Sequence, residues 1–298
     1  MADFGPLVSA SWLLENNGAP DLKLVDGSWR MPGQGHAYSD YKKRHIPSAI
    51  FFDIDEISDQ ASDLPHMAPS PEQFEQQVGA LGISDKDRVV IYDDQGMFSA
   101  ARVWWTFRLM GHEQVAVLDG GLPHWQEKGG VLTDEKPSLS PTAYKASFKS
   151  KHVCNAATVL SVLKSGKAAV VDARPASRFA GEVDEPRAGL RKGAMPGAVN
   201  VPFGHLLRED KTMRSPEDIQ KIFKAAGAQM DQPIITTCGS GVTAAILSLA
   251  LETAGHHRHS LYDGSWSEWG QIGNNQAGSN EASRAEQFPV VKAEQHSS

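Results

Sequence analysis

The chain has 298 residues, which is enough for about two domains of ordinary size. Its 29 Lys and Arg against 36 Asp and Glu give a formal charge of −7, which argues against binding to nucleic acid or to an anionic membrane, so we expect a small-molecule partner. Two cysteines, Cys154 and Cys238, exclude a disulfide framework and a four-thiolate zinc site, and at least one is a candidate reactive thiol.

The N-terminus, MADFGPLVSASWLL, is not typical of a secretory signal. Asp3 comes early, and no positive cluster precedes the short apolar stretch. The most apolar long segment, VTAAILSLALETAG from Val242, is too short to cross a bilayer and contains Ser248 and Glu252. We therefore expect a cytoplasmic protein with no transmembrane helix.

The first half of the chain alternates apolar runs with helical patterns. SPEQFEQQVGALG from Ser70 predicts a helix, with Ser as the N-cap, Pro at the first helical position and Gly82 at the stop. The runs RVVIYD from Arg88 and QVAVLD from Gln114 indicate buried strands, and SAARVWWTFRLMG from Ser99 indicates a helix between them. This alternation is typical of a parallel sheet covered by helices.

The second half repeats this pattern. AAVVDA from Ala168 and PIITTC from Pro233 indicate strands, and SPEDIQKIFKAAG from Ser215 indicates a capped helix. Further matching pairs are Asp26 and Asp172, Pro47 and Pro196, and Trp125 and Trp269. We predict two tandem α/β domains at 1–130 and 151–275, a linker at 131–150, and a mobile tail at 276–298.

The two copies differ at the end of one predicted strand. Cys238 aligns with Asp94, so only the second copy carries a thiol at the edge where open α/β sheets place their ligands. The residues at 239–241, Gly-Ser-Gly, let the chain curl so that backbone N–H groups can stabilise a thiolate. The sequence predicts a nucleophile here; the alternative is a buried, inert cysteine. Cys154 lacks this context and is expected to be structural or incidental.

The loop CGSGVTAA in the second of two repeated α/β domains resembles the rhodanese superfamily. The motifs LVDGSW, RHIPSAIFFDID, LPHM, FSAARVWW, DARPASRF, EVDEPR and YDGSWSEWG extend the resemblance over nearly the whole chain. It implies two tandem rhodanese-like domains, the first without a catalytic cysteine. It also implies that Cys238 removes sulfur from 3-mercaptopyruvate, leaves pyruvate, and passes the sulfur to a thiol such as thioredoxin or to cyanide. No metal or organic cofactor is implied.

The loop also bears on the choice of donor. Superfamily members that use thiosulfate typically have basic side chains after the cysteine, where this chain has Gly239 and Ser240. A donor that bears a carboxylate needs its cation elsewhere, and Arg178 and Arg187 are the candidates. The alternative is surface arginines paired with neighbouring acidic residues, namely Glu182, Asp184 and Glu185.

The resemblance implies roles for several other residues. Ser240 is expected to relay or donate a proton, and Thr243 to contact the sulfur unless it only caps the helix. Gly241 and Val242 complete the substrate-binding loop. In the first copy, Asp55 is expected to orient Ser240 across a cleft between the domains.

His66 is expected to bind substrate or tune a proton, with a structural role as the alternative. We expect His45 to be structural, and His256, His257 and His259 to lie in a solvated loop with no metal-ligand pattern.

Three other functions compete with 3-mercaptopyruvate sulfur transfer. Thiosulfate could be the donor. A phosphatase of rhodanese-like fold would need Arg six residues after the cysteine, where this chain has Ala244. A non-catalytic binding module is the third alternative, and the intact cysteine loop argues against it.

Overall fold

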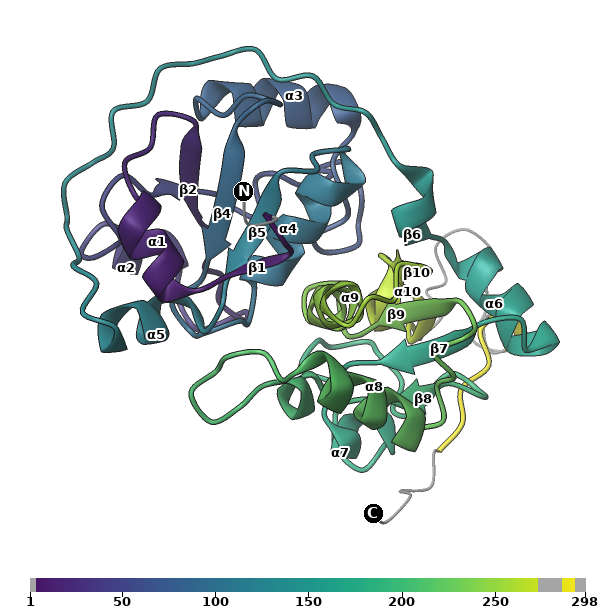
Figure 1. The fold of residues 1–298 in the computed structure, drawn as a ribbon. Helices are drawn as coiled ribbons and strands as arrows, with labels where there is room; N and C mark the ends of the chain where they lie inside the picture. Colours follow the sequence, from purple (N-terminus) through teal and green to yellow (C-terminus); the bar gives the residue numbers. More distant parts are fainter. Residues whose placement is uncertain (1–3, 273–285, 293–298) are drawn as a thin grey trace. The chain divides into compact units, whose positions relative to one another are not determined.

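The computed structural model describes residues 4–272 and 286–292, and the chain divides into two compact units. The first comprises Met1–His152 with Leu207–Ser215, and the second comprises Val153–Leu206 with Pro216–Ser298. Each unit contains a five-stranded sheet, ordered β1-β5-β4-β2-β3 in the first and β6-β10-β9-β7-β8 in the second, and the paired strands are parallel (Figure 1). The matching order confirms the predicted repeat and the α/β fold class.

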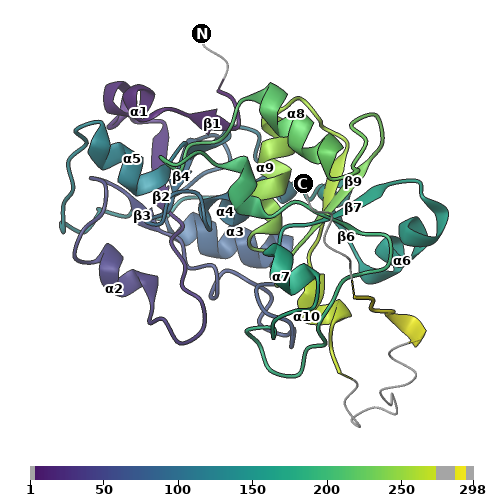
Figure 2. The same cartoon turned by 90° about the horizontal axis from the view of Figure 1, so that it is seen from below.

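The α-helices and strands of the first unit alternate along the chain. They are β1 (Leu7–Val8), α1 (Ala10–Asn16), β2 (Leu22–Asp26), α2 (Ala37–Tyr41), β3 (Ile50–Phe51), α3 (Pro71–Ala80), β4 (Arg88–Tyr92), α4 (Ala100–Leu109), β5 (Val115–Leu118) and α5 (Gly121–Glu127). Figure 2 shows the strands between α1 and α5 on one side and α3 and α4 on the other. Val90 and Tyr92 pack with Leu13 and Trp125 on the α1 and α5 side, as the alternation of strand side chains requires. The sheet is therefore buried on both faces.

The predicted linker follows the first unit closely. Thr142 N–H donates to the Gly79 carbonyl at 2.9 Å, and Ser147 N–H donates to the Met110 carbonyl at 2.7 Å. Tyr144, buried, packs against the ring of Phe74. Figure 1 shows this segment running along the outside of the first unit to a short 3-10 helix at its end. The linker is thus bound in place by backbone hydrogen bonds and one aromatic anchor.

The second unit repeats the architecture. Its elements are β6 (Val153–Cys154), α6 (Ala156–Ser165), β7 (Ala169–Asp172), α7 (Ala176–Phe179), β8 (Val199–Asn200), α8 (Pro216–Ala225), β9 (Ile234–Thr237), α9 (Ala244–Thr253), β10 (His259–Tyr262) and α10 (Ser265–Trp269). The helices predicted at Ser70 and Ser215 begin at the following prolines, and the Ser70 hydroxyl accepts from Gln73 N–H at 3.2 Å. None of the described helices is long and apolar enough to span a membrane.

The expected mobile tail, 276–298, is packed where the structure describes it. Phe288 is buried, and its ring centroid lies 5.2 Å from that of Trp269. Arg191 donates from Nη2 to the Phe288 carbonyl at 2.9 Å, and Val291 forms an antiparallel bridge with Ala194. Residues 286–292 are therefore packed against the second unit through a buried apolar side chain, and the mobility expected of the tail stays a prediction. The rest of the predicted tail from 276 lies outside the described residues.

Candidate active site in the second unit and its first-unit counterpart

Cys238 directly follows β9 at the carboxyl edge of the second sheet. Its side chain is almost fully buried, with 2 % of the residue exposed. The Cys238 carbonyl accepts from Trp266 N–H at 3.0 Å, and the Gly239 carbonyl accepts from Ser267 N–H at 2.8 Å. Cys238 N–H lies 3.3 Å from the Ser265 hydroxyl. The start of α10 therefore holds the backbone of the cysteine loop through consecutive residues, which fixes the thiol at the strand end.

After the cysteine, the backbone turns into α9 with its N–H groups available. Gly241 adopts a φ of 80°, a left-handed conformation that favours glycine. Thr243 occupies the N-cap of α9 but makes no side-chain capping bond. Nothing in residues 4–272 or 286–292 accepts a hydrogen bond from the backbone N–H of Ser240, Val242 or Thr243. Such N–H groups at the start of a helix can stabilise an anion.

The equivalent loop of the first unit is already filled by the chain's own carboxylates. Asp93 accepts from the backbone N–H groups of Ser99 and Ala100, each at 2.8 Å. Asp94, at the position equivalent to the cysteine, is bound by Arg30, with 2.8 Å between Nη1 and Oδ1. The N–H groups at the start of α4 are thus occupied, and only the second unit offers a thiol beside free donors.

Arg178, in α7, lies beside the cysteine loop. A Cβ atom placed on Gly239 would be 3.0 Å from Nη2 of Arg178, so the absence of a side chain there makes room for the guanidinium. Arg178 also forms a two-nitrogen ion pair with Glu185, whose side chain is 1 % exposed. Arg174 donates to the same carboxylate at 2.9 Å and stacks over Trp266 at 4.0 Å. Arg178 is therefore paired with a buried carboxylate next to the cysteine loop. The alternative in the sequence analysis was a pairing of this kind on the protein surface.

Arg187 lies two residues after Glu185 and is partly buried. Of the acidic residues considered as alternative partners, Asp184 instead binds Lys192, with 2.8 Å between oxygen and nitrogen. The approach of Arg187 to the cysteine loop stays a prediction.

In the first unit, the structure brings Asp55 and His66 together. His66 Nδ1 lies 2.8 Å from Asp55 Oδ1, and the Trp29 indole N–H donates to both carboxylate oxygens at 3.2 and 3.1 Å. Burial acts to raise the pKa of Asp55, but the close contact with His66 and the hydrogen bond from the Trp29 indole outweigh it and lower the pKa. Asp55 is thus held as an anion. Its predicted action on Ser240, in the other unit, stays a prediction.

Cys154 and His45 have the surroundings of structural residues. Burial raises the pKa of the Cys154 thiol to about 12, so very little thiolate is present at neutral pH. His45 is buried, and its two ring nitrogens bond the carbonyls of Tyr41 and Glu135 at 2.7 and 3.0 Å. These surroundings agree with the structural roles expected for Cys154 and His45.

The solvated loop predicted for three histidines is wrong for two of them. His256 is buried, and its ring nitrogens bond the carbonyls of Met230 and Arg258 at 3.1 Å. His259 is also buried, in β10, and lies 3.2 Å from Glu252, which His257 contacts as well. The loop is short, so the His256 ring reaches backbone carbonyls and the His259 ring reaches Glu252 on α9. Amino-acid composition alone does not predict these contacts.

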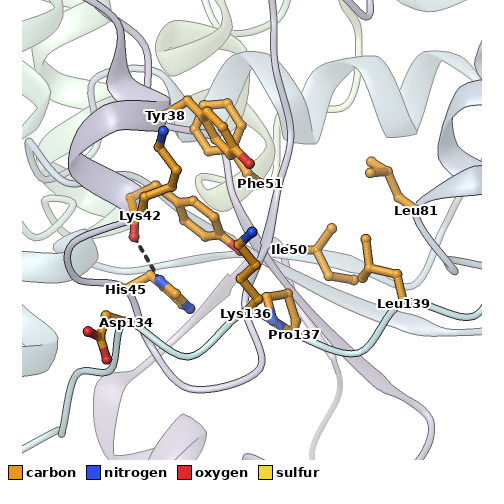
Figure 3. Close-up of a pocket in the computed structure, with 11 residues that line it drawn as sticks. Tyr38, Lys42, His45, Ile50, Phe51, Leu81, Asp134, Lys136, Pro137 and Leu139 are labelled. Atoms are coloured by element: carbon orange, nitrogen blue, oxygen red, sulfur yellow. Dashed lines mark hydrogen bonds between the residues drawn. The ribbon is translucent and has the colours of Figure 1, made fainter.

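The first unit also contains a pocket of about 420 Å³ between α2, β3 and the linker (Figure 3). The rings of Tyr38, Tyr41 and Phe51 line it, with Lys42 and Lys136 at its rim. None of the predicted site residues lies in this pocket.

Comparison with known proteins gives consistent matches. Residues 9–128 and 155–272 both match the family model described as "Rhodanese-like domain". The chain is 42% identical over 265 residues to 3-mercaptopyruvate sulfurtransferase of Escherichia coli (strain K12), covering 88% of this chain and 94% of that protein. It is also 42% identical over 270 residues to thiosulfate sulfurtransferase of Bos taurus, covering 88% and 91%. The crystal structure of SseA from Escherichia coli superposes with a TM-score of 0.81 at 40% identity, covering 89% of this chain and 100% of that one.

Proposed function

Because this chain is a sulfurtransferase that belongs to the rhodanese family, we propose that it takes sulfur from 3-mercaptopyruvate through a persulfide on Cys238. The Cys238 thiolate attacks the donor sulfur and the carbon–sulfur bond breaks. Its electron pair goes to the carbon, which gives pyruvate once the enolate takes a proton. An acceptor thiol, such as that of thioredoxin, or cyanide then takes the outer sulfur and regenerates the thiolate.

The observation that carries this proposal is the cysteine loop. The buried sulfur lies at a strand end, and the backbone N–H groups of Ser240, Val242 and Thr243 donate to no acceptor within the described part of the chain. Donors fixed in this way can stabilise both the resting thiolate and the charged persulfide without reorganising. Gly241 shapes this loop through its left-handed conformation, and we assign the Val242 N–H to donor binding and the Thr243 hydroxyl to contact with the sulfur.

Donor recognition rests on Arg178. Its guanidinium is held by Glu185 beside Gly239, where it can bind the carboxylate or keto oxygen of 3-mercaptopyruvate. Arg187 is the second arginine of the proposal. Thiosulfate would be favoured by cations directly after the cysteine, and Gly239 and Ser240 supply none.

We assign proton transfer to Ser240 and His66, and we assign to Asp55 the role of orienting the imidazole of His66. Asp55 is occupied by His66 and Trp29, so His66 is better placed than Asp55 to exchange a proton with the Ser240 hydroxyl. This requires closure of the two domains over the donor. The arrangement follows the general logic of a hydroxyl, an imidazole and an orienting carboxylate.

Steady-state assays with the two donors test the proposal. Pyruvate release from 3-mercaptopyruvate with a thiol acceptor should be catalytic, and kcat/KM should exceed the value for thiosulfate by at least about tenfold, the equivalent of one charged hydrogen bond. Equal values for both donors would contradict the assigned selectivity. The absence of pyruvate would contradict the function itself.

The arginines give a sharper prediction. Arg178→Leu and Arg187→Gly should each raise KM for 3-mercaptopyruvate by roughly ten- to a hundredfold, because each removes a charged partner worth about 1.5–3 kcal/mol. Arg258→Leu is the matched control, since Arg258 is exposed and donates to the Asp231 carbonyl at 3.0 Å. Unchanged KM in both arginine variants would refute the assigned donor contact.

A further inference from the structure

Trp29 contacts both members of the Asp55–His66 pair. It lies in the loop after β2, and Asp55 lies in the loop after β3; these strands pair in parallel, so both loops leave the same edge of the sheet. The Trp29 residue is 5 % exposed. Its carbonyl accepts from Gln95 Nε2 at 3.1 Å, and its ring stacks on Phe98 with centroids 6.2 Å apart.

The same indole contacts both members of the pair. Its N–H is shared between the two Asp55 oxygens, and its ring meets the His66 ring edge-on, with centroids 4.8 Å apart and planes at 81°. His66 itself has a φ of 62°, and Arg102 donates to its carbonyl. Asp55 is the exposed member, with 49% of its side chain accessible, against 6% for His66. An exposed carboxylate rotates freely unless something holds it, and the indole N–H does so.

We propose that Trp29 is a positioning residue for the reaction, which fixes the Asp55 carboxylate against Nδ1 of His66 and thereby the tautomer of the imidazole. A carboxylate at Nδ1 favours the tautomer that carries the proton there, which leaves Nε2 as the proton acceptor. The inference rests on the proposed role of His66 in sulfur transfer.

The test compares Trp29→Phe with Trp125→Phe in the full-length protein. Phe keeps an aromatic ring but removes the N–H. Trp125 is the matched control, because it is buried in the same unit and its indole N–H donates to the Val131 carbonyl at 3.0 Å, remote from Asp55 in sequence. Nitrogen-15 NMR of the His66 ring reports the tautomer, and steady-state kinetics report kcat and KM for 3-mercaptopyruvate.

In Trp29→Phe, the Nδ1–H tautomer should lose its preference, and kcat should fall roughly tenfold with little change in KM. Trp125→Phe should change neither. An unchanged His66 spectrum in Trp29→Phe would overturn the inference, as would a changed spectrum with unchanged kcat. The spectrum does not depend on turnover, so a failure of the proposed function, seen as no pyruvate from the wild-type protein, is distinguishable.

A second measurement covers the case in which Trp29→Phe does not fold. In Asp55→Asn, the indole N–H resonance of Trp29 should shift more than any other assigned indole resonance, because its charged acceptor becomes neutral. A Trp29 resonance that moves no more than that of Trp125 would overturn the inference.

Discussion

Replacing Cys238 with Ser should abolish pyruvate release from 3-mercaptopyruvate, because the hydroxyl oxygen cannot form a persulfide. The expected loss is at least about 10⁴-fold in kcat, the scale on which covalent nucleophiles contribute. Stopped assays for pyruvate measure this loss, at an enzyme concentration high enough for a roughly 10⁴-fold slower reaction to be detected. The sulfur atom is buried at the strand end, so Ser fits the site with little change in packing.

The control for this experiment is Cys154→Ser. The high pKa of Cys154 leaves it protonated, so this variant should keep most of the wild-type activity. Residual turnover in Cys238→Ser, lost only when Cys154 is also replaced, would show that the nucleophile has been assigned to the wrong cysteine.

His66→Asn should produce the second largest loss, about 10²-fold or more in kcat, because general acid–base groups contribute on that scale. Asp55→Asn should produce a smaller loss in the same parameter, since Asn can still accept a hydrogen bond from Nδ1 but carries no charge. Both residues lie in the first unit and Cys238 lies in the second, so a loss of kcat would also show that the reaction needs both units.

His256→Asn serves as the comparison, because the two ring nitrogens of that buried side chain bond the backbone carbonyls of Met230 and Arg258. A loss in His256→Asn as large as in His66→Asn would point to general destabilisation. Full activity in His66→Asn would contradict the role of the first domain in the chemistry.

The strands and helices were predictable because their signals are local. The run RVVIYD becomes β4, and Ser70 with Pro71 starts α3 through a bond to a residue three positions away. The internal repeat then predicted that the two halves share one topology, and both sheets do have equivalent strand orders. The cysteine loop was predictable for the same reason, because its glycines and its place between a strand and a helix are contiguous in sequence.

Contacts between distant residues were not predictable in this way. Glu185 in a charged loop is typical of a solvated side chain, yet Arg174 and Arg178 bury it. Trp29 and Asp55 meet only because β2 and β3 pair, and Phe288 is buried by Trp269 from beyond a long polar segment. These partners depend on tertiary packing, and no short sequence pattern encodes them.

The central claim is a persulfide on Cys238, and a single-turnover experiment tests it most directly. The protein is mixed with 3-mercaptopyruvate without an acceptor, and pyruvate and protein mass are measured together, followed by peptide mapping. The account predicts one pyruvate per chain and one added sulfur on the peptide that contains Cys238. Pyruvate released without an added sulfur, or a sulfur located on Cys154, would contradict it.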